Sequence, residues 1–441
     1  MRAWVVALLV AGCTPAPPPR AAAPPPPTAK PPFVVPSAAP APRDDTPPAG
    51  ITPLTALPGV VLEDGVRRLP RSELPLAVTA LVIHGGSGDD GADLGAAEVA
   101  AQLMALAVEK HFQARVSVDA DAIVLEVAHH SADFAKVEQT LGAALKAPPL
   151  AALEQARKRA LAAPRDLGRE ALARELFLLP TGRHPYGHPH APRSAIEKIT
   201  AQSVLAFLRR QKGVELVSVG DVTQPTGRYS ATMPSAPPTP LPEPGLRIVV
   251  VQAAGTPRVQ VGTLAPGDAA HDVALALASD RAPAGTRWFS EEHPTGPALM
   301  GLERDADDAT AAVQSLLDAL GGATQADSDA IDVTARRVAD APLVDLPSIA
   351  GAAAVLEHDA VLGLDADAFD ARRRARRDVE PKAVLAAAKQ LARKNALVVT
   401  VTGDANPEPL TAIAPVWIVD PARDFVVERK LPFDPTRRKA P

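Results

Sequence analysis

The chain has 441 residues, a net charge of −5 at pH 7 and only 3% aromatic residues. Without a basic excess, and with few aromatic side chains for base stacking, the composition argues against nucleic acid as a partner. A single cysteine leaves no intramolecular disulfide, so the fold has to depend on the burial of apolar side chains.

The N-terminus has the pattern of a secretory signal. Arg2 adds a positive charge, and the apolar run Ala3–Ala11 is shorter than the roughly 20 residues of a membrane-spanning helix. Residues 10–13, Val-Ala-Gly-Cys, resemble a bacterial lipobox, whose cysteine is acylated. We therefore expect a lipoprotein signal peptide over residues 1–13 with lipidation at Cys13; the alternative is a cytosolic start with a chance cysteine. By the same resemblance, Thr14 in place of Asp predicts a lipid-anchored protein of the cell envelope, in the outer membrane and facing the periplasm.

Residues 14–50 consist mostly of proline and alanine. Proline lacks a backbone N–H and fixes φ, so this segment is expected to be an extended polyproline II spacer between the anchor and a folded body. A ligand for proline-binding modules is the alternative interpretation.

The rest of the chain contains two copies of one pattern. The run that ends at Asp221 (Val-Ser-Val-Gly-Asp) recurs 183 residues later in the run that ends at Asp404 (Val-Thr-Val-Thr-Gly-Asp). The starts of the two copies, residues 59–62 and 245–248, correspond at a similar offset of 186. We therefore predict a duplicated unit of about 185 residues. The predicted order is a first unit at 51–230, a proline-rich linker at 231–245, a second unit at 246–425 and a C-terminal tail at 426–441.

Within the first unit, apolar β-branched runs alternate with helical patterns. Strands are predicted over Ala77–Ile83 and Ala122–Ala128, with a helix over Leu94–Lys110 between them. Two more helices are predicted over Leu150–Ala163 and Leu167–Leu178, interrupted at Pro164. This order predicts an α+β fold of two homologous units, each a largely antiparallel sheet with helices packed on one face.

The most specific motif is His184–Pro189 (His-Pro-Tyr-Gly-His-Pro), followed by Ser194-Ala195-Ile196 and by Ile199-Thr200. Together with the duplication, it resembles the insulinase or pitrilysin group of zinc metallopeptidases (inverzincins), over roughly residues 58–421. Active members carry His-x-x-Glu-His on the helix after the first long strand. The two histidines, one turn apart, bind Zn²⁺, and the glutamate activates water. A third ligand, a glutamate, comes from a helix downstream.

This chain departs from the family motif at every one of these positions. With Gly95 aligned to the family glycine, Glu98 replaces the first histidine, Ala101 the catalytic glutamate and Gln102 the second histidine. The stretch Arg159–Ala163 stands where the third ligand is expected. Loss of a general base alone removes about 10²- to 10⁴-fold in rate. We therefore expect no catalytic residue, no metal ligand and no cofactor, although active family members bind zinc.

A second departure concerns the substrate-binding Arg and Tyr that the second unit contributes in the family. The chain has only Tyr186 and Tyr229, both in the first unit. Arg287 remains as half of that pair, with an ordinary surface arginine as the alternative interpretation.

His184, His188 and His190 form the densest histidine cluster. A metal site is one interpretation; the other is a structural loop, because Pro185 and Pro189 prevent the helix on which imidazoles would converge.

Three other segments have plain interpretations. His129 and His130 end a strand near Glu126 and should face opposite sides of the sheet. Residues 85–88, Gly-Gly-Ser-Gly, follow a strand without a Gly-Lys-Ser/Thr signature, which favours a loop over a phosphate site. The arginine run 372–377 is expected to be a solvated helix face.

The function that this pattern predicts is a non-catalytic peptidase homologue. It would serve as the partner or peptide-binding subunit of an active insulinase-like zinc peptidase, with extended peptides as ligands. One alternative is an active zinc-dependent metalloendopeptidase with displaced ligands such as Glu98 and His111, although 13 helical residues span roughly 20 Å. The other is a solitary structural surface lipoprotein.

Overall fold

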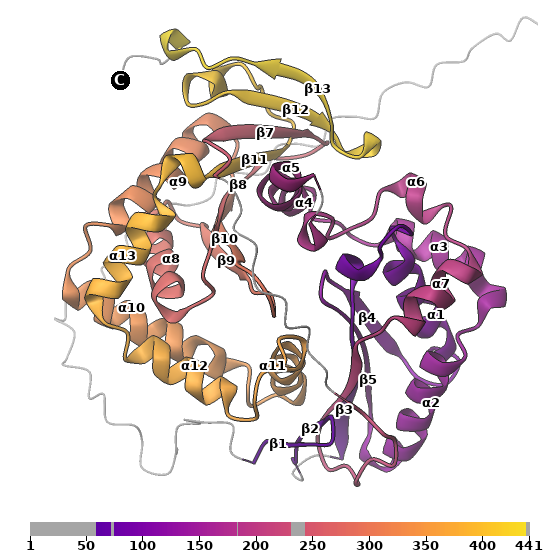
Figure 1. Cartoon of the computed structure of the whole chain (residues 1–441). Coiled ribbons are helices and arrows are strands. Elements are labelled where there is room, and N and C mark those ends of the chain that lie inside the picture. The colour runs from indigo at the N-terminus through magenta and orange to yellow at the C-terminus, as the bar shows by residue number, and fades with distance from the viewer. Residues whose placement is uncertain (1–58, 72–74, 183, 231–242, 438–441) are drawn as a thin grey trace, which may run out of the picture. The chain divides into compact units, whose positions relative to one another are not determined.

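The computed structural model describes residues 59–71, 75–182, 184–230 and 243–437. All of them belong to one unit, Leu54–Pro441, and they form two mixed β-sheets covered by helices (Figure 1). We call residues 59–230 the first half and residues 243–437 the second half. The expected signal peptide, Cys13 and the proline-rich spacer lie outside the described residues.

The sheet of the first half has six strands in the order β1-β2-β6-β3-β5-β4. Their bounds are β1 Val61–Glu63, β2 Val66–Leu69, β3 Leu76–His84, β4 Ala114–Val118, β5 Ala122–His130 and β6 Gly213–Val219. All neighbouring strands are antiparallel except β2 and β6, which run parallel. The two predicted strands of this half are β3 and β5, which pair along their whole length because both are apolar and β-branched.

On one face of this sheet lie α1 and α2, and α3 and α7 pack on α1. The bounds in this half are α1 Ala96–Val108, α2 Phe134–Lys146, α3 Leu153–Ala162, α4 Leu167–Ala173, α5 Leu179–Thr181, α6 Arg193–Ile196 and α7 Ala201–Arg209. α1 is the central helix and is buried almost all round, since its many alanines let neighbouring helices approach closely. α7 begins with a capping box in which Thr200 and Ser203 bond each other's backbone N–H groups.

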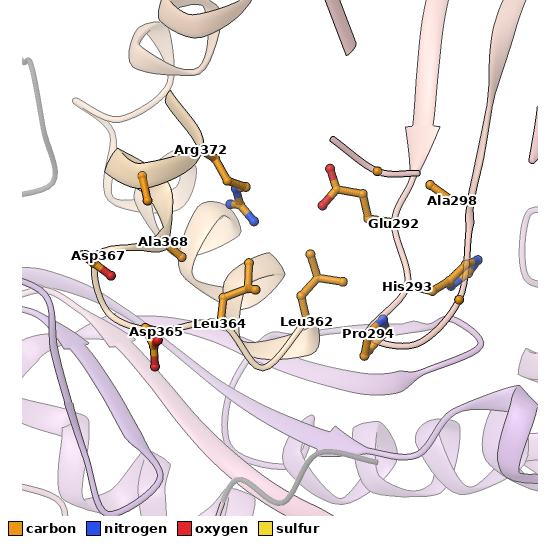
Figure 2. Close-up of a pocket in the computed structure, with 13 residues that line it drawn as sticks. Glu292, His293, Pro294, Ala298, Leu362, Leu364, Asp365, Asp367, Ala368 and Arg372 are labelled. Carbon is orange, nitrogen blue, oxygen red and sulfur yellow. The ribbon is translucent and has the colours of Figure 1, made fainter. Parts of the chain in front are cut away.

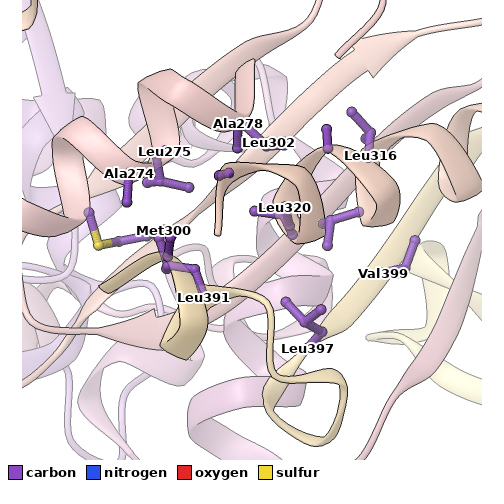
Figure 3. Packing of buried hydrophobic residues seen from close by; sticks show 14 of the residues in the cluster. Ala274, Leu275, Ala278, Met300, Leu302, Leu316, Leu320, Leu391, Leu397 and Val399 are labelled. Carbon is purple, nitrogen blue, oxygen red and sulfur yellow. The ribbon is translucent and has the colours of Figure 1, made fainter. Parts of the chain in front are cut away.

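The sheet of the second half has seven strands in the order β13-β12-β7-β11-β8-β10-β9. The strands are β7 Arg247–Gln252, β8 Arg258–Ala265, β9 Arg287–Glu291, β10 Ala298–Asp305, β11 Val398–Gly403, β12 Val416–Asp420 and β13 Val426–Leu431. The helices are α8 Ala269–Arg281, α9 Ala309–Ala323, α10 Ser328–Asp340, α11 Ile349–Val361, α12 Ala368–Arg377 and α13 Pro381–Leu391. In the core of this half, Met300 of β10 lies near Leu275 of α8 and Leu391 of α13 (Figure 3).

Each sheet receives a helix from the other half on its second face. α11 packs on β3 and β6, and α4 with the π-helical turn Arg174–Leu178 packs on β7, β8 and β11 (Figure 1). A Cβ atom at Gly168 would lie 2.1 Å from Oε1 of Gln260, so any larger residue at this position of α4 would require the buried side chain of Gln260 on β8 to move. The starts of α4 and α11 are 182 residues apart, close to the predicted repeat. The expected two-unit α+β fold is confirmed, and the two halves share their helices reciprocally.

Two details of the predicted repeat need correction. β7, which starts at Arg247, lies parallel to β11 just as β2 lies parallel to β6. β7 therefore corresponds to β2 and not to residues 59–62, the segment that the sequence comparison had paired with it. Residues 426–431, assigned from the sequence to a tail, form β13 and pair with β12 at the edge of the second sheet.

The prediction that arginines 372–377 form a solvated face is wrong. Arg372 bonds Asp359 of α11, Arg373 bonds Asp340 of α10 and Arg376 bonds Asp272 of α8. Because Asp359 and Asp272 are almost fully buried, α12 uses its cations to neutralise carboxylates of the helices around it.

Within the described ranges, no single helix is long and apolar enough to cross a membrane. Only the pair Ser328–Val344 and Ile349–Val361, bent by 116°, meets the length and composition requirement together.

A carboxyl pair joins α11 to the first sheet. Burial raises the pKa of Glu357 to about 8, and the charge of Glu126 on β5 and its hydrogen bond add to the shift, while Arg115 opposes it. The folded protein keeps this proton to a higher pH than the unfolded chain. The free energy of unfolding should therefore fall as the pH rises from about 4.5 to 8. We expect Glu357→Gln to remove about 2 kcal/mol of that fall, measured by urea unfolding at pH 5 and pH 9.

The matched control is Glu154→Gln, because the side chain of Glu154 is 76% exposed. This control should leave the pH profile of stability unchanged. If the free energy of unfolding fell equally with pH in Glu357→Gln and in the parent protein, Glu357 would not be the group that causes the fall.

Candidate functional site

The first turn of α1 presents Glu98, which the sequence comparison places where active insulinase-like peptidases have their first zinc-binding histidine. Asp90 fixes the start of the helix by accepting from the N–H groups of Gly95 (2.6 Å) and Ala97 (2.8 Å). Oε1 of Glu98 bonds Nδ1 of His190 at 2.9 Å and accepts from the N–H of Ala191 at 3.2 Å. The carboxylate of Glu98 is thus used to hold the loop that follows the His-Pro-Tyr-Gly-His-Pro motif.

The other positions that the sequence comparison aligned with the zinc site have different surroundings. Ala101 of α1 and Ala160 of α3 belong to one apolar cluster, so methyl groups fill the contact between these two helices. Arg159 points to Glu109, with Nη1 at 2.7 Å from Oε2. Gln102 is partly buried, and His111 lies beyond the end of α1 with its side chain exposed. The suggested pair of Glu98 and His111 is therefore not brought together.

The histidines of the His184–His190 cluster have three different partners. His184 stacks on Phe177 with ring centroids 4.9 Å apart, and burial lowers its pKa. His188 contacts Arg174, and burial followed by that cation lowers its pKa as well. For His190, burial lowers the pKa, but the hydrogen bond and charge of Glu98 outweigh it and raise the pKa. Among the described residues, no three His, Cys, Asp or Glu side chains are grouped to hold a metal ion.

The pair at the end of β5 behaves as its alternation predicts. His129 is buried and its Nε2 lies 2.9 Å from Oγ1 of Thr79, whereas His130 is exposed. Neither imidazole joins a larger site.

The Gly-Gly-Ser-Gly segment supports the neighbouring hairpin. The N–H groups of Gly85, Ser87 and Gly88 donate to carbonyl oxygens of residues 119–121 at 2.8–3.0 Å. Since these donors are used internally, the segment is a loop, and it fixes the β4–β5 turn that carries Asp119 and Asp121.

A cavity of about 550 Å³ lies between residues of both halves. The first half contributes the β4–β5 turn, α4 and the loop with Tyr186, and the second half contributes the end of β9 and part of α11. Its charged and imidazole side chains are Asp119, Asp121, Asp166, Arg169, Glu170, His190, Glu291, Glu292, His293 and His358. This is the principal candidate site, and it is rich in carboxylates.

Three of these carboxylates are paired with arginines, namely Asp166 with Arg258, Glu170 with Arg165 and Glu291 with Arg169. Arg169 bonds Glu291 at 2.6 Å and Glu303 of β10 at 2.9 Å, and its guanidinium lies over the ring of Phe289. Burial raises the pKa of Glu303, but hydrogen bonds from Arg169, Arg258 and Gln260 lower it to about 2. Glu303 also accepts from Nε of Arg287 at 3.2 Å, although the side chain of Arg287 remains 60% exposed.

Three contacts join the halves at the cavity wall. The rings of Tyr186 and His293 stack with centroids 3.7 Å apart. Nδ1 of His293 lies 2.8 Å from Oδ2 of Asp121, and the hydroxyl of Tyr186 lies 2.9 Å from that of Thr295. Sequence reasoning missed Asp121, His293 and Thr295, because residues over 100 positions apart with no motif give no signal of contact.

Two edge strands border the cavity. β4 and β9 are the last strands of their sheets, and Val118, Ser290 and Glu291 line the cavity. An edge strand presents unpaired backbone N–H and C=O groups that an extended peptide can pair with. The geometry therefore suits binding of an extended chain, whereas the α1 positions do not fit a zinc ion.

No family model matches the chain, and no curated protein matches its sequence. Solved structures match its fold. The peptidase M16 inactive domain from Pseudomonas fluorescens has a TM-score of 0.61 at 17% identity, over 77% of this chain and 95% of that chain. An M16-like peptidase from Alicyclobacillus acidocaldarius has a TM-score of 0.61 at 15% identity, over 77% of this chain and 96% of that chain. The first half of the periplasmic protease PqqL from Escherichia coli has a TM-score of 0.59 at 14% identity, over 78% of this chain and 91% of that chain. At these identities the similarity establishes the fold that the chain shares with M16-like peptidase domains.

Proposed function

We propose that this chain is a non-catalytic member of the insulinase or pitrilysin group, the M16 peptidases. In this proposal it binds extended polypeptide segments as the partner subunit of an active zinc peptidase at the cell envelope. The observation that carries the proposal is the composition of α1, where Glu98 is bonded to His190 and Ala101 packs in the core. The fold similarity to an M16 domain described as inactive supports it.

Catalysis is absent in this proposal because no group can perform it at the family position. A methyl group at Ala101 cannot take a proton from water. Glu98 is 7% exposed and its bonded oxygen already accepts from a backbone N–H, so it is held as a structural anchor. The carboxamide of Gln102 is a poor zinc ligand.

Peptide binding is proposed because the cavity lies between two sheet edges. A peptide that pairs with β9 or β4 would satisfy the backbone groups of that strand, and its alternate side chains would face the carboxylate-rich cavity. The location at the cell envelope is proposed from the lipobox-like sequence that ends at Cys13 and from the proline-rich spacer, both of which lie outside the described residues.

The test combines metal analysis with a peptide assay on the purified protein. We expect less than 0.1 zinc per chain, no cleavage of a fluorogenic peptide library with or without added zinc, and measurable binding of extended peptides. Peptides with N-methyl groups on the strand-pairing edge should lose binding, because methylation removes the donors.

A homologue with an intact His-x-x-Glu-His motif serves as the positive control for cleavage. Copurification of such a homologue with the tagged, membrane-extracted protein is the expected result for the partner role. Stoichiometric zinc together with chelator-sensitive cleavage would contradict the proposal and favour an active metalloendopeptidase. Failure to copurify any homologue would favour a solitary lipoprotein.

A further inference from the structure

A second cavity of about 540 Å³ adjoins the first one. It lies between the loop from Glu292 to Ala298 and the segment that connects α11 to α12 (Figure 2). Glu292 and His293 line both cavities, so the two spaces are neighbours along one loop. None of its residues belongs to the α1 positions discussed above.

One part of this cavity is apolar. In Figure 2, Leu362 and Leu364 lie side by side below Glu292 and Arg372, which face each other across the cavity. Ala298 and Ala368 are almost fully buried and also line the cavity. Such a surface suits the methylene stem of a long side chain.

The segment below the cavity is fixed by the first half. Arg67 of β2 donates from Nη2 to the carbonyl of Leu364 at 2.6 Å and from Nη1 to the carbonyl of Asp365 at 3.3 Å. Arg67 is itself bonded to Glu215 at 2.7 Å, and both side chains are 1% exposed. The cavity is therefore held in shape by buried contacts.

The polar lining carries an excess of negative charge. Three carboxylates, Glu292, Asp365 and Asp367, line it together with one guanidinium, that of Arg372. The guanidinium of Arg372 already bonds Asp359, which is nearly buried. Among the described residues, Glu292 has one ion pair, with Nε2 of His358 at 3.8 Å from its Oε2.

Glu292 is ionised at neutral pH. Burial raises its pKa, but the hydrogen bond and charge of His358 and the charges of Arg372 and Arg376 outweigh burial, and the pKa is lowered. Both arginines have buried carboxylate partners of their own, Asp359 and Asp272. The charge at Glu292 is therefore available to a cationic ligand.

The position of Glu292 connects this cavity to the sheet edge. β9 ends at Glu291, so Glu292 is the next residue of the chain. An extended peptide advances about 3.3 Å per residue. A segment paired along β9 would bring one of its side chains to Glu292, on the side of the cavity formed by the loop after β9, whereas Asp365 and Asp367 are exposed on the side formed by the α11–α12 segment.

We propose that this cavity is a specificity pocket for a lysine or arginine side chain of the extended segment bound along β9. The methylene stem packs on Leu362 and Leu364, the cationic head pairs with Glu292, and Asp365 and Asp367 add negative charge from the α11–α12 side of the cavity. This inference depends on the proposed function, because the backbone of the same segment is held by the edge strand.

The experiment measures fluorescence anisotropy of labelled host peptides that differ at one position, Lys, Arg, norleucine or Glu, with the mature full chain. We expect Lys and Arg peptides to bind about 10-fold more tightly than the norleucine peptide, since a charge-assisted contact contributes roughly this factor. Glu292→Gln should reduce the preference to about 2-fold, and the double variant Asp365→Asn/Asp367→Asn should reduce it partly.

The matched control is Asp332→Asn, which removes one negative charge from an exposed position of α10 and should leave the preference unchanged. Circular dichroism and the melting temperature check that each variant folds. The double variant Asp365→Asn/Asp367→Asn alters only exposed side chains, so it tests the preference for Lys and Arg peptides even if Glu292→Gln does not fold. Equal affinity for the Lys and norleucine peptides would overturn this pocket and leave strand pairing intact. If no peptide bound at all, the proposed function would fail, and the pocket with it.

Discussion

Replacement of Arg67 with alanine is expected to lower the free energy of unfolding by about 3–5 kcal/mol. The pair of Arg67 and Glu215 is buried between β2 and β6, and the same guanidinium donates to the carbonyls of Leu364 and Asp365. Alanine would leave the carboxylate of Glu215 in the interior without a cation. Urea unfolding followed by circular dichroism at pH 7 measures the loss.

The double variant Arg67→Met/Glu215→Leu separates the charge from the packing. Because it removes both charges and keeps apolar volume, it should recover more than half of the stability lost in Arg67→Ala. The carbonyls of Leu364 and Asp365 still lose their donor, so recovery should be incomplete. A loss below about 1 kcal/mol for Arg67→Ala would show that Glu215 is hydrated or protonated without cost.

The second large effect is expected at Phe177, in the π-helical turn after α4. Its ring stacks on His184 at 4.9 Å and meets the rings of Tyr186 at 5.6 Å and His293 at 5.8 Å edge to face. It also belongs to the apolar cluster on the second sheet that includes Val249. Phe177→Ala should cost about 3–5 kcal/mol, because it opens a cavity in a contact that joins the two halves.

Phe433→Ala is the matched control, since the side chain of Phe433 is 48% exposed. It should change the free energy of unfolding by less than about 0.5 kcal/mol. The variant Phe177→Leu should keep most of the stability that Phe177→Ala loses. Were Phe177→Ala no more destabilising than Phe433→Ala, the aromatic cluster would not be a stabilising contact between the halves.

The elements of the fold were predictable because their signals are local. The β-branched runs at 77–83 and 122–128 became β3 and β5, and the alanine-rich segment 94–110 became α1. The departure of residues 98, 101 and 102 from the zinc-binding motif stays a prediction from the sequence comparison. A helix period and a motif both need only neighbouring residues.

The site needed contacts that no local pattern contains. Glu98 and His190 are 92 positions apart, and Asp121 and His293 are 172 positions apart. The arginines at 372–377 were assigned to solvent because a charge run does not reveal that Asp359 and Asp272 lie opposite it. The apolar character of 349–361 indicates burial, but the sheet that it covers is set by tertiary packing.

The reciprocal placement of α4 and α11 has a consequence for biogenesis. β6 completes the first sheet at Val219, but the helix that covers its second face, α11, begins only at Ile349, after 129 intervening residues have been synthesised. Until then Val78, Ala80 and Val82 of β3 form an exposed apolar surface with which other polypeptides can associate. Neither half can finish its core alone during translation, and a chaperone that shields this surface until α11 arrives would raise the yield of native protein.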